Sequence, residues 1–161
     1  MGWFSLVGQI NSNEKEQHPE RGIFTELMDP KHDPEILYLR KLSQAKKVAN
    51  EYFLHGRATK PVPEQSHLPL NSVSSVAWLS RNEDSMLVPI TTVNREGQYN
   101  IDMTFDLTKY GLLGDSKGLF TVKKLSAYEG QESANLGTFS QKEVKINLEM
   151  PGREIILLEI K

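Results

Sequence analysis

Residues 99–107 decide the fold class, and their sequence is YNIDMTFDL. Every second side chain from Tyr99 to Leu107 is apolar, and the side chains between them are polar or acidic. Successive side chains of a β-strand point to opposite faces, so this alternation predicts a strand with one face in a core and the other in water. A strand buried on one face is typical of antiparallel sheets.

Further apolar stretches of similar length surround this strand in the second half of the chain. The predicted strands are residues 72–80, 86–93, 98–107, 119–128, 142–150 and 154–160, with turns at residues 82–85 and 95–97. Pro151-Gly152 is predicted to join the last two strands as a tight hairpin. Short strands at this spacing predict a mainly β fold, an antiparallel β-sandwich with Greek-key-like connections.

One long amphipathic helix is predicted before this β region, over Asp33–Leu54. Asp33 suits the N-cap, Pro34 the first helical position and Gly56 the C-terminal end. Apolar side chains recur at three- and four-residue spacing and predict a packed face: Ile36, Leu39, Leu42, Ala45, Ala49, Tyr52 and Phe53. The predicted solvated face contains Arg40, Lys41, Lys46, Lys47, Asn50 and Glu51.

The beginning of the chain contains a short apolar run, Trp3–Ile10, without alternation. Such a run is expected of a barrel-like strand buried on both faces, which needs neighbouring βα units that this sequence does not supply. We therefore expect an excerpt of a larger protein; a complete small domain with an irregular N-terminal arm is the alternative. The expected parts are a barrel-like region (1–60), a proline-rich linker (61–69) and the sandwich (70–161).

Composition argues against several classes of function. The chain has 161 residues, 19 of them basic and 21 acidic, and its net charge of −2 gives no electrostatic footprint for nucleic acid. The absence of cysteine excludes disulfides, thiolate metal sites and cysteine nucleophiles. Trp3–Ile10 is too short and too polar for a membrane anchor or a signal peptide. No glycine motif for phosphate is present, and no cofactor is expected.

No complete catalytic or metal-ligating pattern is present. One loop combines carboxylates with an imidazole: Glu14, Glu16, His18 and Glu20. Their spacing matches no metal signature, and a hydrated loop is the simpler interpretation. Asp102 and Asp106 share a predicted strand face about 13 Å apart, which is too far for a pair of glycosidase carboxylates. We therefore predict no catalytic residue and no metal site within this sequence.

Trp78 and Tyr99 are the aromatic residues that suit a sugar ligand best. An aromatic face complements the C–H face of a sugar ring, while the polar tips of tyrosine and tryptophan reach hydroxyl groups. Aromatic residues in strands usually fill a core, so core packing is the simpler interpretation of Trp78. An interface with a neighbouring domain is the other alternative.

The order of these segments resembles the C-terminal region of multidomain glycoside hydrolases. In that family the last strand and helix of a catalytic barrel lead into an accessory β-sandwich. The stretches that show the resemblance are DPEILYLRKL (33–42), YFLHGR (52–57), SVAWL (75–79), VPI (88–90) with Asn94, TFDL (104–107), LGTF (136–139) and PGREIILLEI (151–160). The resemblance implies that the catalytic carboxylates lie on earlier barrel strands, which this sequence does not contain.

The leading hypothesis is therefore a non-catalytic C-terminal portion of a carbohydrate-active hydrolase, in which the sandwich buttresses the upstream catalytic barrel. A carbohydrate-binding module is the alternative, and a self-contained enzyme using the acidic loop is a third hypothesis. Barrel sites form at the C-terminal ends of strands, so the resemblance makes Gln9, Asn11 and His18 candidates for substrate contact. Trp78 is the fourth candidate, carbohydrate is the expected ligand, and neither nucleic acid nor a membrane is an expected partner.

Overall fold

The computed structural model describes residues 30–59, 65–66, 73–92, 96–112, 117–126 and 132–161. Within these ranges the chain is mainly β, with antiparallel sheets and one long helix, which confirms the predicted fold class. The chain divides into two compact units, Met1–Leu39 and Arg40–Lys161, and the second contains all of the strands described. The apolar run Trp3–Ile10 lies outside the described residues.

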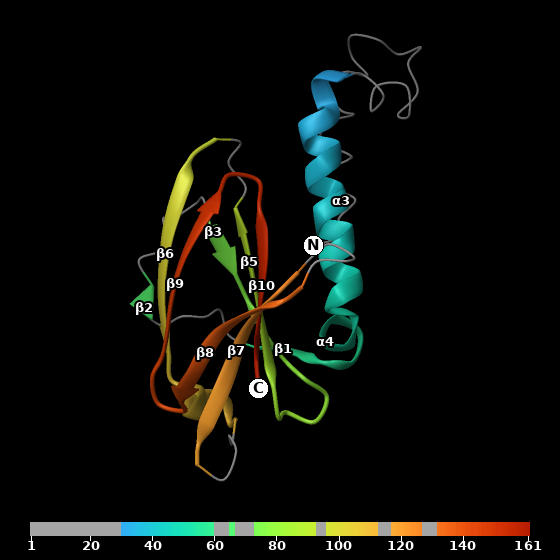
Figure 1. Ribbon diagram of the computed structural model, residues 1–161. Coiled ribbons are helices and arrows are strands. Elements are labelled where there is room, and N and C mark those ends of the chain that lie inside the picture. The colour runs from blue at the N-terminus through green and yellow to red at the C-terminus, as the bar shows by residue number, and fades with distance from the viewer. Residues whose placement is uncertain (1–29, 60–64, 67–72, 93–95, 113–116, 127–131) are drawn as a thin grey trace. The chain divides into compact units, whose positions relative to one another are not determined.

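The helices and strands are labelled in Figure 1. Their bounds are η1 Pro30–His32, α3 Asp33–Val48, α4 Asn50–His55, β1 Arg57–Thr59, β2 Gln65–Ser66, β3 Val73–Ser75, β4 Ala77–Leu79, β5 Met86–Thr92, β6 Gln98–Phe105, η2 Leu107–Tyr110, β7 Leu119–Leu125, β8 Ala134–Ser140, β9 Val144–Pro151 and β10 Ile155–Ile160.

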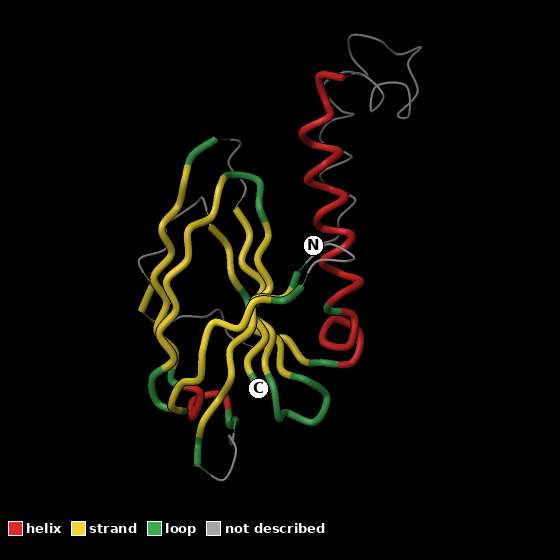
Figure 2. Tube along the Cα trace, in the orientation of Figure 1, coloured by secondary structure: helices red, strands yellow, loops and turns green. Residues whose placement is uncertain are grey.

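The strands form two antiparallel sheets that pack face to face, as the tube in Figure 2 shows. Sheet A has the order β1-β4-β5-β10-β7-β8, with β3 also paired to β5, and sheet B has the order β2-β6-β9. An inter-sheet core fills the space between them. From sheet A it takes Ala77, Leu79, Met86, Val88, Ile90, Phe120, Val122, Ile156, Leu158 and Ile160, and from sheet B Ile101, Met103, Phe105, Val144, Ile146, Leu148 and Met150.

Sheet B follows the alternation that the sequence predicts. Met103 and Phe105 of β6 are buried and lie opposite Ile146 and Val144 of β9. The strand ends at Phe105, two residues before the predicted end, because the next side chain starts a 3₁₀ turn: the Asp106 carboxylate accepts the Thr108 N–H at 3.0 Å. The Thr108 hydroxyl also donates to this carboxylate and holds the pKa of Asp106 below its usual value.

The predicted strand over residues 72–80 is two strands, β3 and β4, interrupted at Val76. The register pairs Ser75 with Ile90 and Trp78 with Leu87, so Val76 falls opposite Pro89. Proline has no N–H to donate to a neighbouring strand, which explains why the ladder breaks at this position.

The predicted hairpin at Pro151-Gly152 is wrong, because the two strands it joins belong to different sheets. β9 pairs with β6 in sheet B, whereas β10 pairs with β5 and β7 in sheet A. The corner is held by Thr92, whose buried hydroxyl donates to the Pro151 carbonyl and accepts the Glu154 N–H, each at 2.8 Å. The connection therefore crosses the sandwich from one sheet to the other.

Three of the strands were not predicted from the sequence. β8 pairs with β7 along an edge of sheet A, and its register shifts at a bulge near Gly137, which has φ +127°. A bulge of this kind twists an edge strand, so its unpaired backbone groups pair less readily with another chain. β1 pairs with β4 and β2 pairs with β6, so both short strands near the proline-rich stretch join the sandwich.

The outer face of sheet A forms a second, helix-facing core with the helices. Ala45, Ala49 and Tyr52 pack there against Leu87 of β5 and Leu157 of β10. Four partly buried side chains complete the margin of this core: Phe53, Trp78, Leu125 and Ile155. Sheet A is thus buried on both faces, and the C-terminal part of the predicted apolar stripe, Ala45, Ala49, Tyr52 and Phe53, packs on it.

The predicted single helix over Asp33–Leu54 is divided at Ala49 into α3 and α4. Gly56 ends α4, as predicted, and its N–H donates to the Tyr52 carbonyl. A Cβ atom at Gly56 would come within 2.3 Å of the Leu79 carbonyl oxygen, so the close approach of helix and strand requires glycine. Lys41 was predicted to be solvated, but it pairs with Glu154 at 2.7 Å and its side chain is 27% exposed.

Candidate functional site

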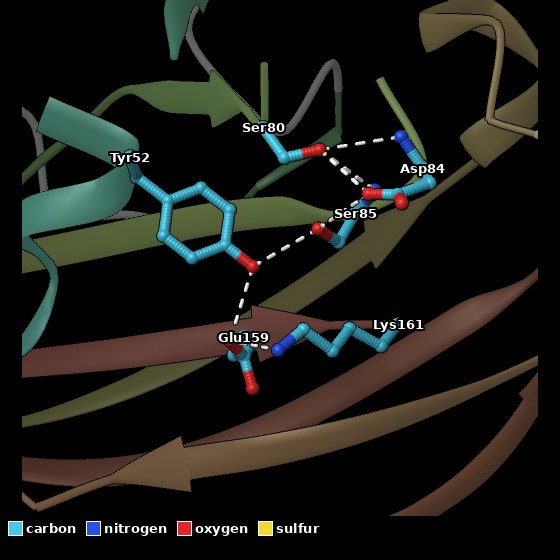
Figure 3. Close-up of polar contacts among 6 residues, drawn as sticks. All are labelled: Tyr52, Ser80, Asp84, Ser85, Glu159 and Lys161. Atoms are coloured by element: carbon cyan, nitrogen blue, oxygen red, sulfur yellow. Dashed lines mark hydrogen bonds and ion pairs between the residues drawn. The ribbon is translucent and has the colours of Figure 1, made fainter. Parts of the chain in front are cut away.

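A cluster of polar side chains lies where α4 meets sheet A, and Figure 3 shows its contacts. We call it the Tyr52 cluster, and its members are Tyr52, Ser80, Asp84, Ser85, Glu159 and Lys161. They come from α4, from the turn between β4 and β5, and from the end of β10 with the residue after it. Segments far apart in the sequence therefore supply the polar groups of one small region.

Tyr52 stands at the centre of the cluster, with only 6% of its surface exposed. Its hydroxyl oxygen lies 3.0 Å from Glu159 Oε1 and 3.1 Å from Ser85 Oγ. Lys161 Nζ approaches the same Glu159 oxygen to 2.8 Å from the solvent side, where the lysine side chain is 60% exposed. These contacts join the helix to the central strand β10 and to the β4–β5 turn.

The β4–β5 turn is organised by Ser80. Its hydroxyl donates to Asp84 Oδ1 at 2.8 Å and accepts the N–H groups of Asp84 and Ser85, each at 3.2 Å. The Ser85 hydroxyl donates to the same Asp84 oxygen at 3.0 Å. Hydroxyls that bond to nearby backbone groups in this way are typical of tight turns.

The two hydroxyl groups at the centre supply fewer protons than their contacts use. Each hydroxyl has one proton to donate. When Tyr52 donates to Glu159 and Ser85 donates to Asp84, no proton remains for the 3.1 Å contact between Tyr52 Oη and Ser85 Oγ. In that arrangement both oxygens keep lone pairs that can accept a hydrogen bond.

Burial shifts the pKa of Tyr52, and hydrogen bonds shift that of Asp84. Burial raises the pKa of Tyr52, and the neighbouring Glu159 carboxylate adds to this increase, while the Ser85 hydrogen bond opposes it. Donation from Ser80 and Ser85 holds the pKa of Asp84 below its usual value. Tyr52 is therefore neutral and Asp84 ionised throughout the physiological range of pH.

A cavity of about 410 Å³ opens beside the cluster. Its floor contains the buried side chains of Tyr52 and Ser85, and Glu159 lies next to them. Its rim contains Val48 at the end of α3 and Lys161, together with exposed charged and amide side chains of helix α4 and the β4–β5 turn: Glu51, Arg81, Asn82 and Asp84. Its volume lies in the range of small-molecule sites.

The cluster does not have the features of a hydrolytic site. A glycosidic general acid needs a raised pKa, whereas the pKa of Asp84 is lowered by its hydroxyl donors. Glu159 Oε1 is occupied by Tyr52 and Lys161. Among the described residues no three His, Cys, Asp or Glu side chains are grouped so that they could hold a metal ion. The arrangement is suited to hydrogen bonding rather than to bond cleavage.

The structure places Trp78 in the margin of the helix-facing core. Its ring meets that of Phe53 edge to face, with centroids 5.2 Å apart and an angle of 87° between the planes. Tyr99 is partly buried against the inter-sheet core, and its hydroxyl donates to the Glu96 carbonyl at 3.3 Å. The two aromatic residues therefore pack in different cores.

The remaining predicted contact residues, Gln9, Asn11 and His18, lie outside the described residues, as do Glu14, Glu16 and Glu20. The Tyr52 cluster was not predicted from the sequence. Two features of the sequence could have indicated it. One is Glu159, the acidic residue in the apolar run IILLEI, and the other is the hydroxyl group of Tyr52 within the apolar stripe of the helix. Neither signal identifies its partner, because the pairing depends on how the helix packs on the sheet.

No protein family, curated protein or solved structure matches this chain. In the part of the chain that the structure describes, no helix has the length and apolar character to cross a membrane.

Proposed function

We propose that this chain is a non-catalytic C-terminal portion of a carbohydrate-active hydrolase, and that its sandwich buttresses an upstream catalytic barrel. The family part of the proposal rests on the resemblance of the segment order and motifs to glycoside hydrolases. The buttressing part rests on one observation, the helix-facing core on the outer face of sheet A.

The helix-facing core supports this function because it makes the helix an integral part of the sandwich. Ala45 and Ala49 are each 1% exposed, and Leu87 and Leu157 opposite them are fully buried. Alanine lets the helix backbone approach the sheet closely, and burial of large apolar side chains on both sides stabilises the contact. A barrel helix held in this way would transmit the rigidity of the sandwich to the barrel.

Polar contacts at both ends of β10 fix the position of the helix further. Lys41 of α3 pairs with Glu154 just before β10, and Tyr52 of α4 bonds to Glu159 near its end. The helix cannot slide along the sheet without breaking one contact or both. The apolar packing between these two ends is non-directional, so the ion pair and the hydrogen bond define the position of the helix along the sheet.

The proposal can be tested by detaching the helix in the full-length gene product that contains this sequence. Ala49→Glu places a charge in the helix-facing core, and Asn50→Glu introduces the same side chain at the exposed neighbouring position. We expect Ala49→Glu to lower the free energy of unfolding by about 3 kcal/mol or more. We expect it to lower the melting temperature of glycosidase activity as well, while Asn50→Glu leaves both near the wild-type values.

Two outcomes would contradict the proposal. Turnover of aryl glycosides by the 161-residue chain alone, abolished by changes at Glu14, Glu16 or Glu20, would make it a self-contained enzyme. Glycosidase activity that survives heating equally in both glutamate variants would show that the sandwich does not support a catalytic domain. The encoded sequence upstream of Met1 offers a direct check, since the proposal requires seven preceding βα units there.

A further inference from the structure

The cavity beside the Tyr52 cluster has the chemistry of a binding site that the buttressing function does not require. Its floor is polar and buried: Tyr52 is 6% exposed and Ser85 is 4% exposed. Its rim combines charged groups with an apolar wall, Val48, which is 43% exposed.

The charges around the cavity favour a neutral ligand. Glu51, Asp84 and Glu159 contribute negative charge, and Arg81 and Lys161 contribute positive charge. An anion would meet the carboxylates and a cation would meet the arginine and the lysine, and either would lose hydration without full compensation. A neutral molecule with both donors and acceptors meets a partner for each group.

The hydroxyl groups of Tyr52 and Ser85 on the floor of the cavity have no proton left to donate to a ligand. When Tyr52 donates to Glu159 and Ser85 donates to Asp84, both hydroxyl protons are committed to carboxylates, and the two hydroxyl oxygens retain acceptor capacity. A ligand hydroxyl that donates to this oxygen pair would complete the network. Other hydroxyl groups of the same ligand can donate to the outer oxygen of Asp84 and accept from Lys161 or Arg81.

From these features we propose that the cavity binds a neutral polyhydroxylated ligand, a sugar ring of one or two units. Val48 offers an apolar surface to the C–H groups of such a ring, and the polar floor and rim serve its hydroxyl groups. The site is distinct from Trp78 and Tyr99. The inference does not rest on the proposed function, because binding here requires only the sandwich and the helix packed on it.

The test is a titration of the isotopically labelled 161-residue chain with glucose, galactose, xylose and cellobiose, followed by NMR chemical shifts. We expect saturable shifts at Val48, Asp84 and Lys161 with a Kd on the order of 1 mM, because the rim is solvated and the cavity is open. Glucuronate, glucosamine and inorganic phosphate serve as charged probes and should bind more weakly than the best neutral sugar.

Two variants check the assignment. Asp84→Asn should weaken binding about tenfold, because an acceptor with a full charge is replaced by a neutral amide. Arg81→Gln at the exposed rim should weaken binding with no change in melting temperature, so that a loss of folding in the first variant does not decide the result. Asp102→Asn makes the same chemical change on the outer face of sheet B and should leave binding unchanged.

The proposal would be overturned if none of the neutral sugars gave saturable shifts, or if phosphate or glucuronate bound more tightly than all of them. Shifts centred on Trp78 or Tyr99 would move the sugar site elsewhere and overturn this assignment too. Failure of any of these tests would leave the helix-detachment result untouched, so the two proposals can fail separately.

Discussion

The neighbouring strands β9 and β10 differ in burial although the same corner connects them. In β9, buried and exposed residues alternate without exception from Val144 to Pro151. In β10 no residue is exposed, and Ile156, Leu157 and Leu158 are buried in succession. The first strand has one packed face and the second has two, because within the described ranges a helix packs on the outer side of sheet A and none packs on that of sheet B.

The apolar pattern of a strand therefore indicates whether one or both of its faces are packed against another layer. NLEMP at residues 147–151 alternates, whereas IILLEI at residues 155–160 is continuous apart from one glutamate. Continuous runs are usually associated with parallel sheets covered by helices on both faces. Here the same pattern occurs in an antiparallel sheet that lies between another sheet and a helix.

The largest expected effect comes from placing aspartate on each face of the two strands. Leu157→Asp and Leu158→Asp should both lower the free energy of unfolding by about 3 to 5 kcal/mol, because each buries a charge without a partner. In β9, Leu148→Asp should be similarly severe, and Glu149→Asp on the exposed face of the same strand should cost less than about 0.5 kcal/mol.

Urea unfolding of the four variants measures these values. A mild effect of Leu157→Asp would show that the helix does not cover sheet A in solution, and the contrast between the strands would disappear.

A smaller effect is expected from removing the hydroxyl group that joins the helix to β10. Tyr52→Phe should lower the free energy of unfolding by about 1 to 2 kcal/mol at neutral pH. The pKa of Tyr52 is raised in the folded state, so its contribution is present below the unfolded value of 10.0 and is lost as pH rises above it. The difference between wild type and variant should therefore shrink at alkaline pH.

Denaturant titrations at pH 7 and above pH 10 test this expectation. Tyr99→Phe provides the matched control, because the Tyr99 hydroxyl contacts a backbone carbonyl at an exposed position. A Tyr52→Phe difference that grows with pH would contradict the assigned contact with Glu159.

The smallest effect is expected at the other end of β10. Lys41→Met keeps the length of the side chain but removes the ion pair with Glu154, whose side chains are 27% and 22% exposed. The expected loss is about 0.5 to 1 kcal/mol and should decrease with added salt. Lys46→Met, at an exposed position of the same helix, is the control and should have no measurable effect. Equal losses of stability in the two variants would show that the ion pair between Lys41 and Glu154 does not stabilise the fold.

The sequence was sufficient to predict the sandwich but not the layer outside it. The period of two in residues 99–107 indicated a core on one side, and the period of the helix indicated a packed face. Neither pattern says that the helix packs on the outer face of sheet A, because that contact joins residues more than a hundred positions apart, such as Ala49 and Leu157.

The candidate site was less predictable than the fold for the same reason. Tyr52 was interpreted as part of an apolar stripe, which is where its ring lies, but its hydroxyl function depends on Ser85 and Glu159. The hairpin prediction at Pro151-Gly152 was wrong because the turn residues were compatible with both a hairpin and a crossing between sheets. The Thr92 hydroxyl, which holds the crossing, is distant in sequence.

The position of β10 in sheet A determines when the parts of this sheet can pair during translation. β10 lies between β5 and β7, so the strands made first and those made later meet only through this late segment. During translation, β1, β3, β4 and β5 can pair as soon as they emerge, but β7 and β8 have no place in sheet A until β10 has left the ribosome. The nascent chain therefore exposes the edges of β5 and β7 that β10 later covers, and unpaired strand edges of this kind are prone to pair with other chains.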